Sequence, residues 1–329
     1  MSEKSLLKGI KISEISDFKI GNAQDIISAT GCTAIICEEG ATAGVCVRGG
    51  SPASRETELL HPENTVQKIN CVMLSGGSAY GLEAGDGAMT FLEEKGIGFD
   101  VGIGRVPIVC GASLFDLEIG SFNIRPDKKM GYKACVNAYS GVEPEEGNAG
   151  AGTGATVGKL HNEKDMMKCG LGIYAIQIGE IKCGAVVAVN ALGDVTDYET
   201  GRILAGLLND DHTDFYGSVK CLYEELERPR DLWSGNTTIG CVITNARLDK
   251  SQCTKSASII HNALAKTISP AHSTADGDTI FIMASGKKEV HVDAFNALAT
   301  EVMARAVNRA ALMAKPAYGL KAACDFMKC

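Results

Sequence analysis

The sequence predicts an α/β protein in which helices cover the outer faces of β-sheets. Hydrophobic residues make up 45% of the 329 positions, which is enough to bury a sizeable core. Paired runs rich in Val, Ile and Ala are typical of β-hairpins, and they alternate with amphipathic segments of helical periodicity. The 38 glycines lie beside these runs and indicate tight turns and close backbone approaches.

The first half of the chain predicts a hairpin, a strand–helix unit and another strand. In residues 32–47 the runs CTAIIC and TAGVCV flank EEGA, which favours a β-hairpin. Residues 69–96 predict a strand, a glycine-rich turn and a helix. Residues 105–117 predict a buried strand, whereas residues 118–150 are polar and irregular.

The second half begins with a hairpin and ends with two strand–helix units. The hairpin is expected over 171–179 and 181–195, and a polar connector of low order is expected over about 194–234. The two units are a strand over 236–246 with a helix over about 250–266, and a strand over 276–286 with a helix over about 293–313. We expect Asp293 to be the N-cap of the last helix and Pro316 to end it.

Charge and cysteine usage exclude several classes of protein. The net charge is −8 without a basic block, so nothing in the charge pattern points to a nucleic-acid partner. No apolar run reaches the roughly 18 residues of a membrane span, and the N-terminus lacks the apolar core of a signal peptide, which predicts a cytoplasmic location. The 13 cysteines are scattered through apolar stretches without a CxxC pair, so we expect no metal site and a reducing compartment.

Two glycine-rich segments resemble phosphate-binding loops only in part. The segment from Gly150 to Lys159 ends in Gly-Lys, but Thr153 stands where a Walker loop needs glycine, and Leu160 stands where it needs Ser or Thr. The segment SGGSAYGLEAGDG lacks the dinucleotide-binding register. Both segments can instead form turns, or line a small-molecule pocket with Lys159. Ser78 and Tyr80 can belong to that pocket or pack structurally.

The segment around Thr237 is the most informative about chemistry, because a polar connector ends there at a hydroxyl residue that opens an apolar strand. A Thr hydroxyl can attack the carbonyl of the preceding residue, here Asn236, and form an ester by N→O shift. Hydrolysis then leaves a free α-amine with a pKa of about 7.7–8.0, which can act as a base for the hydroxyl of the same residue. The alternative is a strand that simply opens with β-branched Thr.

Seven segments occur in the order RGGSPASRETELL, MLSGGSAYGLEAGDGAMTFLEEKGIGF, VPIVCGASLFDL, GAGTGATVGK, VAVNALGDV, GNTTIGCVITNA and DGDTIFIMASG. This series resembles the signature of the self-cleaving aminopeptidases, a family that includes L-aminopeptidase/D-esterase, the β-peptidyl aminopeptidases and the nylon-oligomer hydrolase. The resemblance covers about residues 15–315. It implies a four-layer αββα sandwich of the N-terminal-nucleophile type. It also implies a single domain that is cut once into associated chains 1–236 and 237–329, and a tetramer.

The resemblance assigns roles to particular residues. Thr237 matches the nucleophile, and Asn190 matches an amide that donates to the nucleophile or the oxyanion. Asp276 and Asp278 match a pair that orients the amine and hydroxyl of the nucleophile, and Lys159 matches a lysine beside it. Each residue also has a structural alternative, since the two Asp and Asn190 can form turns and Lys159 can be a solvated loop lysine.

The Thr nucleophile, the Asp pair and Lys159 are closer to the nylon-oligomer hydrolase than to the aminopeptidases, which use Ser and a Ser/Glu pair. The expected function is therefore hydrolysis of a small peptide or amide through an acyl-Thr237 intermediate, without a cofactor. Two alternatives remain. One is an acyltransferase of the ornithine acetyltransferase type, and the other is a non-catalytic protein that binds a nucleotide or another small molecule.

Overall fold

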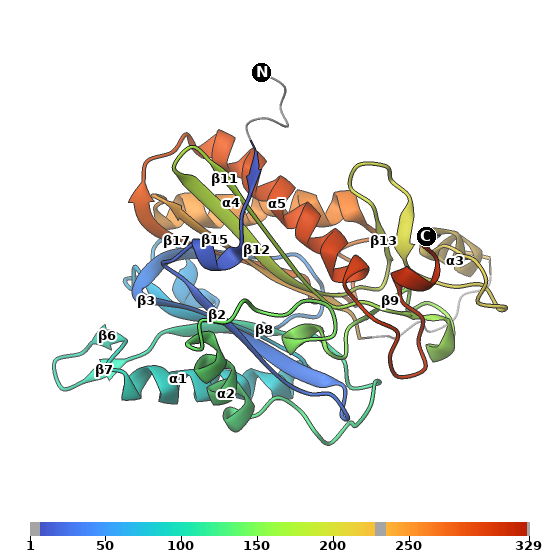
Figure 1. Ribbon diagram of the computed structural model, residues 1–329, viewed down its shortest axis with the longest axis horizontal. Coiled ribbons are helices and arrows are strands. Elements are labelled where there is room, and N and C mark those ends of the chain that lie inside the picture. Colours follow the sequence, from blue (N-terminus) through green and yellow to red (C-terminus); the bar gives the residue numbers. More distant parts are fainter. Residues whose placement is uncertain (1–6, 228–234, 328–329) are drawn as a thin grey trace.

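Ten strands form one continuous sheet in this computed structural model, which describes residues 7–227 and 235–327 (Figure 1). In order across the sheet they are β1 (Lys8–Gly9), β11 (Leu171–Ile178), β12 (Ile181–Asn190), β15 (Thr237–Ala246), β17 (Thr279–Lys288), β3 (Thr30–Val47), β5 (Ile69–Ser75), β8 (Val109–Ser113) and β4 (Ala53–Arg55), and β2 (Lys19–Asp25) also pairs with β3.

The helices and the smaller strands lie around this sheet. The helices are α1 (Ala84–Glu94), α2 (Lys128–Ala138), α3 (Ser218–Glu225), α4 (Lys250–Thr267) and α5 (Val292–Leu312). Short 3₁₀ helices span Ile12–Glu14, Glu58–Leu60, Ser78–Glu83, Gly150–Gly152, Glu163–Asp165 and Ala323–Asp325. The smaller sheets pair β6 (Phe99–Asp100) with β7 (Arg105–Val106), β9 (Thr156–Val157) with β10 (Met167–Lys168), and β13 (Asp194–Thr196) with both β14 (Ile203–Ala205) and β16 (Ile268–Ser269).

Strand β3 joins the two halves of the sheet, and the predicted hairpin over 32–47 is wrong. The first part of β3 pairs with β2 and β5, and its last part, from Thr42 to Val47, pairs with β17. The EEGA segment makes a register shift between Ile36 and Ala41 instead of a turn, with Gly40 at a φ of +74°. A shift of this kind bends a strand without reversing it, so two apolar runs become one long strand.

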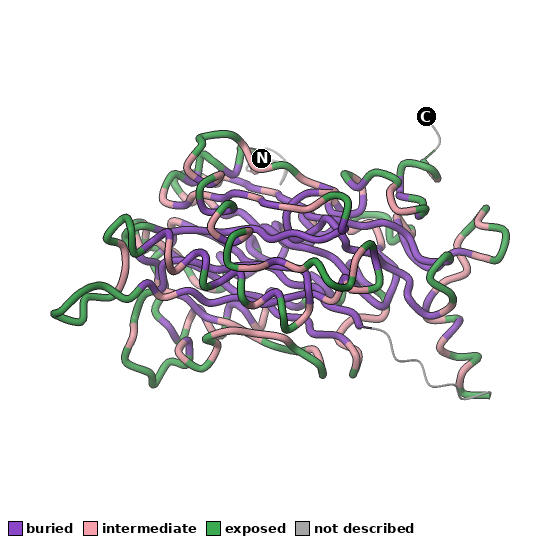
Figure 2. Tube along the Cα trace, turned by 90° about the horizontal axis from the view of Figure 1, so that it is seen from below, coloured by how far each residue is buried: buried purple, intermediate pink, exposed green. Residues whose placement is uncertain are grey.

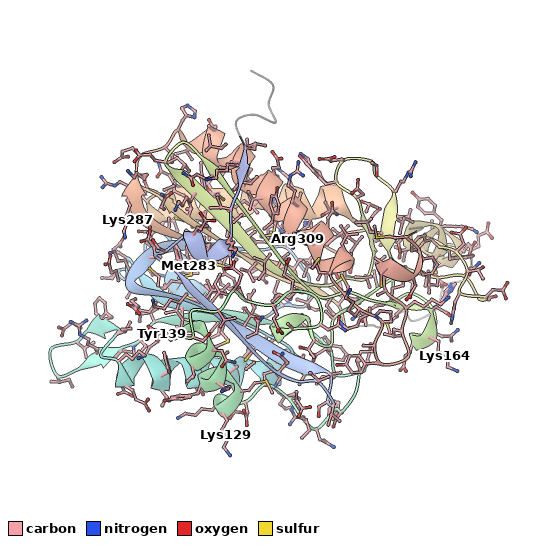
Figure 3. The ribbon with its side chains drawn as sticks, in the orientation of Figure 1. Lys129, Tyr139, Lys164, Met283, Lys287 and Arg309 are labelled. Atoms are coloured by element: carbon pink, nitrogen blue, oxygen red, sulfur yellow. The ribbon has the colours of Figure 1, made fainter. Side chains whose placement is uncertain are left out.

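Three apolar cores separate the layers, and helices cover both outer faces. One core packs β12, β15 and β17 against α4 and α5, and another packs β3, β5 and β8 against α1 and α2. The third lies between the two halves of the sheet and includes Val186, Ile239, Phe281, Ile35 and Leu74. The central strands are therefore buried on both faces, which explains their continuous apolar runs. Figure 2 shows this buried centre, and Figure 3 shows Met283 inside it.

Several other predictions can be compared with the structure. The β11–β12 hairpin forms with Ile178 opposite Ile181, and α4 begins after the N-cap Asp249, close to its predicted start. The last helix begins after His291, so Asp293 lies in its first turn and is not the N-cap. None of the helices in the described part of the chain combines the length and apolarity that a membrane span requires.

Two segments expected to be irregular are ordered. Residues 118–150 contain α2, whose N-cap Asp127 accepts a hydrogen bond from the N–H of Met130 at 2.8 Å. The predicted connector contains β13, β14 and α3, anchored by buried Leu207, Leu208 and Cys221. Polar composition concealed these elements because only a few apolar side chains in each of them reach a core. Residues 228–234 of the connector lie outside the described residues.

Candidate active site

Strand direction brings Asn190, Thr237 and the Asp276–Asp278 turn to one edge of the sheet. β15 runs antiparallel to β12, so that Thr237, its first residue, lies opposite Asn190, the last residue of β12. β15 runs parallel to β17, so the Asp276–Asp278 turn that precedes β17 reaches the same edge. A bridge between Asn236 and Asp276 completes the junction. Residues far apart in the chain therefore meet where β15 begins.

The peptide bond between Asn236 and Thr237 is surrounded by groups that can act on it. The Thr237 hydroxyl contacts the carbonyl oxygen of Asn236, and the N–H of Gly277 donates to the same oxygen at 3.0 Å. A Cβ on residue 277 would lie 2.8 Å from Thr237 Oγ1, so only glycine allows this close approach. Thr237 itself is 3% exposed.

Lys159 and Asn190 form a buried polar pair next to this bond. Lys159 Nζ donates to Asn190 Oδ1 at 2.8 Å and to the carbonyl of Gly235 at 3.0 Å. Asn190 Oδ1 also accepts from the N–H of Thr156 at 3.0 Å, and its Nδ2 donates to the Phe115 carbonyl at 2.7 Å, which sets the orientation of the amide. Burial lowers the pKa of Lys159 to about 8.

The two aspartates have different surroundings. Asp278 accepts from the N–H of Thr238 at 2.7 Å through one oxygen, and its other oxygen lies 2.8 Å from His272 Nδ1. Asp276 accepts from the N–H of Ser273 at 2.7 Å, but its Oδ1 is buried and has no hydrogen-bond partner among the described residues. Burial, and then the charge of Asp278, raise the pKa of Asp276. Asp276 is therefore the carboxylate best suited to accept a proton.

Sequence reasoning missed His272, Gly277 and Phe115. His272 is bonded to Asp278 through its ring and its backbone N–H, with a left-handed φ of +60°. The Phe115 ring lies against Gly235, where a Cβ would come within 2.2 Å of it. The sequence HSTADGD could have pointed to His272, which stands six residues before Asp278. No local pattern marks the other two.

Ser78 and Tyr80 lie in the 3₁₀ turn before α1. The N–H of Ser78 donates to the Leu114 carbonyl at 2.8 Å, which holds the chain just before Phe115. Tyr80 is 57% exposed, and the Arg125 guanidinium lies 4.0 Å from the centre of its ring. Ser78 thus supports the segment that carries Phe115 through its backbone, whereas the Tyr80 ring lies at the surface.

The intact chain fills its own site. Asn236 and Thr237 are buried together with Lys159, Asn190 and Asp276. The cavity of about 910 Å³ between β2 and α2 contains none of these residues; it is lined in part by Lys129, which points away from the sheets in Figure 3. Access to Thr237 therefore requires Gly235 and Asn236 to move.

The chain matches the model of Peptidase family S58 over residues 8–324. An uncharacterized aminopeptidase of Mycobacterium leprae is 38% identical over 320 residues, which cover 90% of this chain and 86% of that protein. A 6-aminohexanoate-oligomer endohydrolase of Kocuria sp. is 30% identical over 309 residues, with coverage of 89% and 83%.

Solved structures share the fold. The L-aminopeptidase D-Ala-esterase/amidase of Ochrobactrum anthropi, described as a variant of the Ntn hydrolase fold, aligns with a TM-score of 0.68 at 16% identity and covers 93% of this chain and 88% of its own. A β-aminopeptidase of Burkholderia sp. aligns with a TM-score of 0.65 at 17% identity, with coverage of 92% and 86%. These matches confirm the resemblance seen in the seven motifs, and the chain belongs to peptidase family S58.

Proposed function

We propose that the protein is an N-terminal-nucleophile amide hydrolase that cuts itself between Asn236 and Thr237 and then hydrolyses amides through an acyl-Thr237 intermediate. One observation carries the proposal. The Thr237 hydroxyl contacts the Asn236 carbonyl, and the Gly277 N–H donates to the same oxygen at 3.0 Å. Nucleophile, target carbonyl and oxyanion donor are thus assembled inside one uncut chain.

Self-cleavage begins with the Thr237 hydroxyl. Asp276 accepts its proton, and Oγ attacks the carbonyl carbon of Asn236 to form a tetrahedral oxyanion that Gly277 stabilises. Collapse of this intermediate breaks the C–N bond. The leaving nitrogen takes the proton back from Asp276 and becomes the free amine of Thr237. Water then hydrolyses the Asn236–Thr237 ester, leaving a carboxylate on Asn236 and a free hydroxyl on Thr237.

The mature site repeats this chemistry on a substrate. The freed amine, with an ordinary pKa of about 7.7–8.0, takes the hydroxyl proton, and the ammonium of Lys159 favours its neutral form. The related proteins named as an aminopeptidase and an oligomer endohydrolase support an amide of a peptide or a peptide-like oligomer as the substrate. Asn190 orients Lys159 through the 2.8 Å hydrogen bond.

The layer order supports the four-layer αββα sandwich of N-terminal-nucleophile enzymes, with α4 and α5 outside one half-sheet and α1 and α2 outside the other. The strand order supports the association of chains 1–236 and 237–329 after the proposed cleavage. The second chain carries β15 and β17, which lie in the middle of the sheet between β12 and β3. Separating the chains would expose two buried faces and the backbone hydrogen bonds of both neighbouring strands.

Intact-mass spectrometry of the purified protein tests the proposal. We expect the wild type to give two chains, one that ends at Asn236 and one that begins at Thr237. We expect the Thr237→Ala variant to give one chain of 34.5 kDa and to have no amidase activity. Thr238→Ala is the matched control, because it makes the same change one residue later, on a buried hydroxyl that has no hydrogen-bond partner within the described part of the chain. A Thr237→Ala protein that still contained two chains would contradict the proposal.

A further inference from the structure

Gly277, Lys159 and Phe115 surround the last two residues before the scissile bond, and we call the space that Gly235 and Asn236 occupy the channel. The carbonyl of Asn236 accepts from the Gly277 N–H at 3.0 Å, and the carbonyl of Gly235 accepts from Lys159 Nζ at 3.0 Å. Two successive carbonyls are thus each bound by a separate donor. In the uncut chain the Asn236 carbonyl stands where the acyl carbonyl of a substrate would later be attacked.

Phe115 forms the third wall. A Cβ on Gly235 would lie 2.2 and 2.3 Å from two carbons of the Phe115 ring, so the channel accepts no side chain at that point. The ring is half-buried and faces the Cα of Gly235.

The backbone around Phe115 is held in place from several sides. Its carbonyl accepts from Asn190 Nδ2 at 2.7 Å. The N–H of the neighbouring Leu114 donates to the Ser75 carbonyl, and the Leu114 carbonyl accepts from the N–H of Ser78. Asn190 bonds Lys159 as well, so a single amide sets the positions of the lysine and of the segment that carries the ring. The ring therefore cannot easily retreat from a bulkier group.

We propose that the channel that holds Gly235 and Asn236 becomes the acyl-side subsite of the mature enzyme, in which Lys159 binds the carbonyl that precedes the scissile amide and Phe115 excludes a substituent on the adjoining carbon. The substrate class is then an acyl chain with an amide carbonyl one residue before the cleaved bond, and with glycine or an unbranched methylene beyond that carbonyl. A free amino-terminal residue lacks this carbonyl. This inference rests on the proposed self-cleavage, which releases Asn236 to vacate the channel.

Four p-nitroanilides test the subsite in the mature enzyme. Acetyl-Gly-Asn and acetyl-Ala-Asn p-nitroanilide differ by one methyl group at the place of Gly235, and we expect kcat/KM to favour the glycyl substrate by on the order of ten-fold. Acetyl-Asn p-nitroanilide supplies a carbonyl to Lys159 that Asn p-nitroanilide lacks, and we expect the acetylated compound to be cleaved at least about ten-fold faster. Equal rates within the first pair, or preference for the free amine in the second, would overturn the inference.

Phe115→Ala should bring the Gly/Ala ratio to within about two-fold, and Phe122→Ala should leave it unchanged, because Phe122 is 55% exposed and lies outside the channel. A ratio between two substrates measured on one protein does not depend on the fraction that folds. A ratio that Phe115→Ala leaves unaltered would overturn the inference.

The uncut chain offers an independent readout. Gly235→Ala should slow self-cleavage, and the double variant Gly235→Ala/Phe115→Ala should restore it, as judged by intact mass over time. Gly235→Ala protein that is cut at the wild-type rate would refute the role of Phe115. Wild-type protein that cuts itself but hydrolyses none of the four substrates would refute the subsite alone, whereas wild-type protein that remains whole would refute the proposed function.

Discussion

Replacing Gly277 by Ala places a methyl group between the nucleophile and the loop that supports it. The new Cβ would lie 2.8 Å from Thr237 Oγ1 and 3.0 Å from the Ser51 carbonyl, whereas ordinary contacts begin at 3.4 Å. The φ of Gly277 lies outside the left-handed region, so the backbone itself accepts alanine. The loop cannot simply withdraw, because the N–H of Ser51 donates to the Asp276 carbonyl at 2.8 Å.

The hydroxyl or the Gly277 N–H must therefore shift by roughly 0.6 Å relative to the Asn236 carbonyl to relieve the contact. Displacement of a nucleophile by about 1 Å, or loss of one oxyanion donor, costs on the order of 10²-fold in rate, which is about 2.7 kcal/mol in activation free energy. We expect the self-cleavage of Gly277→Ala to slow by about this factor.

The assay is a time course of intact mass on freshly purified protein. Gly104→Ala is the matched control, because a Cβ there meets nothing within 4 Å and its φ also lies outside the left-handed region. A Gly277→Ala protein with an unchanged unfolding midpoint that is cut within about three-fold of the wild-type rate would refute the assigned geometry.

Three further outcomes follow from the titrating groups. The rate of self-cleavage should increase as pH rises through the raised pKa of Asp276. Asp276→Asn should lose this pH dependence and cleave at least about 10²-fold more slowly. A variant whose pH–rate profile matches that of the wild type would exclude Asp276 as the base. In the mature enzyme kcat/KM should fall above pH 8 as the Lys159 ammonium deprotonates. Lys159→Arg should move that fall to higher pH, because arginine stays charged. A wild-type kcat/KM that stays constant from pH 8 to 10 would contradict a cationic role for Lys159. Burial lowers the pKa of Lys168 from 10.5 to about 7, so between these pH values the unfolded state binds a proton that the folded state has released. The folded state therefore loses stability as pH falls towards 7, where it must bury the ammonium. The unfolding free energy of the wild type relative to Lys168→Met should therefore rise by about 1.4 kcal/mol per pH unit between pH 7.5 and 8.5 in urea titrations, and a constant difference would refute it.

Local patterns identified most of the central strands and the main helices. The runs that became β11, β12, β15 and β17 are apolar on both faces, and α4 has a clear N-cap in Asp249. The failure over residues 32–47 has a tertiary cause. The EEGA segment contains the residues of a turn but forms a bulge within β3, because β17 on one side and β5 on the other give each part of that strand a partner.

The residues of the site also fall into those that the sequence suggested and those that only the folded structure revealed. The roles proposed for Thr237, Lys159, Asn190 and the two aspartates come from the resemblance of the seven segments to the family. The role proposed for Phe115 and the contact of His272 with Asp278 cannot be inferred in this way, because each depends on a contact that only the folded chain creates. Phe115 stands 120 positions before Gly235. The sequence places His272 near Asp278, but only the folded turn, with a φ of +60° at His272, brings the ring into contact with that carboxylate.

The order of residues by itself determined most of the central strands and the two long helices, since side-chain periodicity is local. It also determined that a hydroxyl residue follows a turn-prone pair at the start of a buried strand. Tertiary structure alone decided what surrounds that hydroxyl. Strand direction brings the end of β12, the start of β15 and the turn before β17 to one edge, and packing against the 114–116 segment closes the channel around Gly235. Such proximities arise from pairing between distant segments, which no local window of the sequence contains.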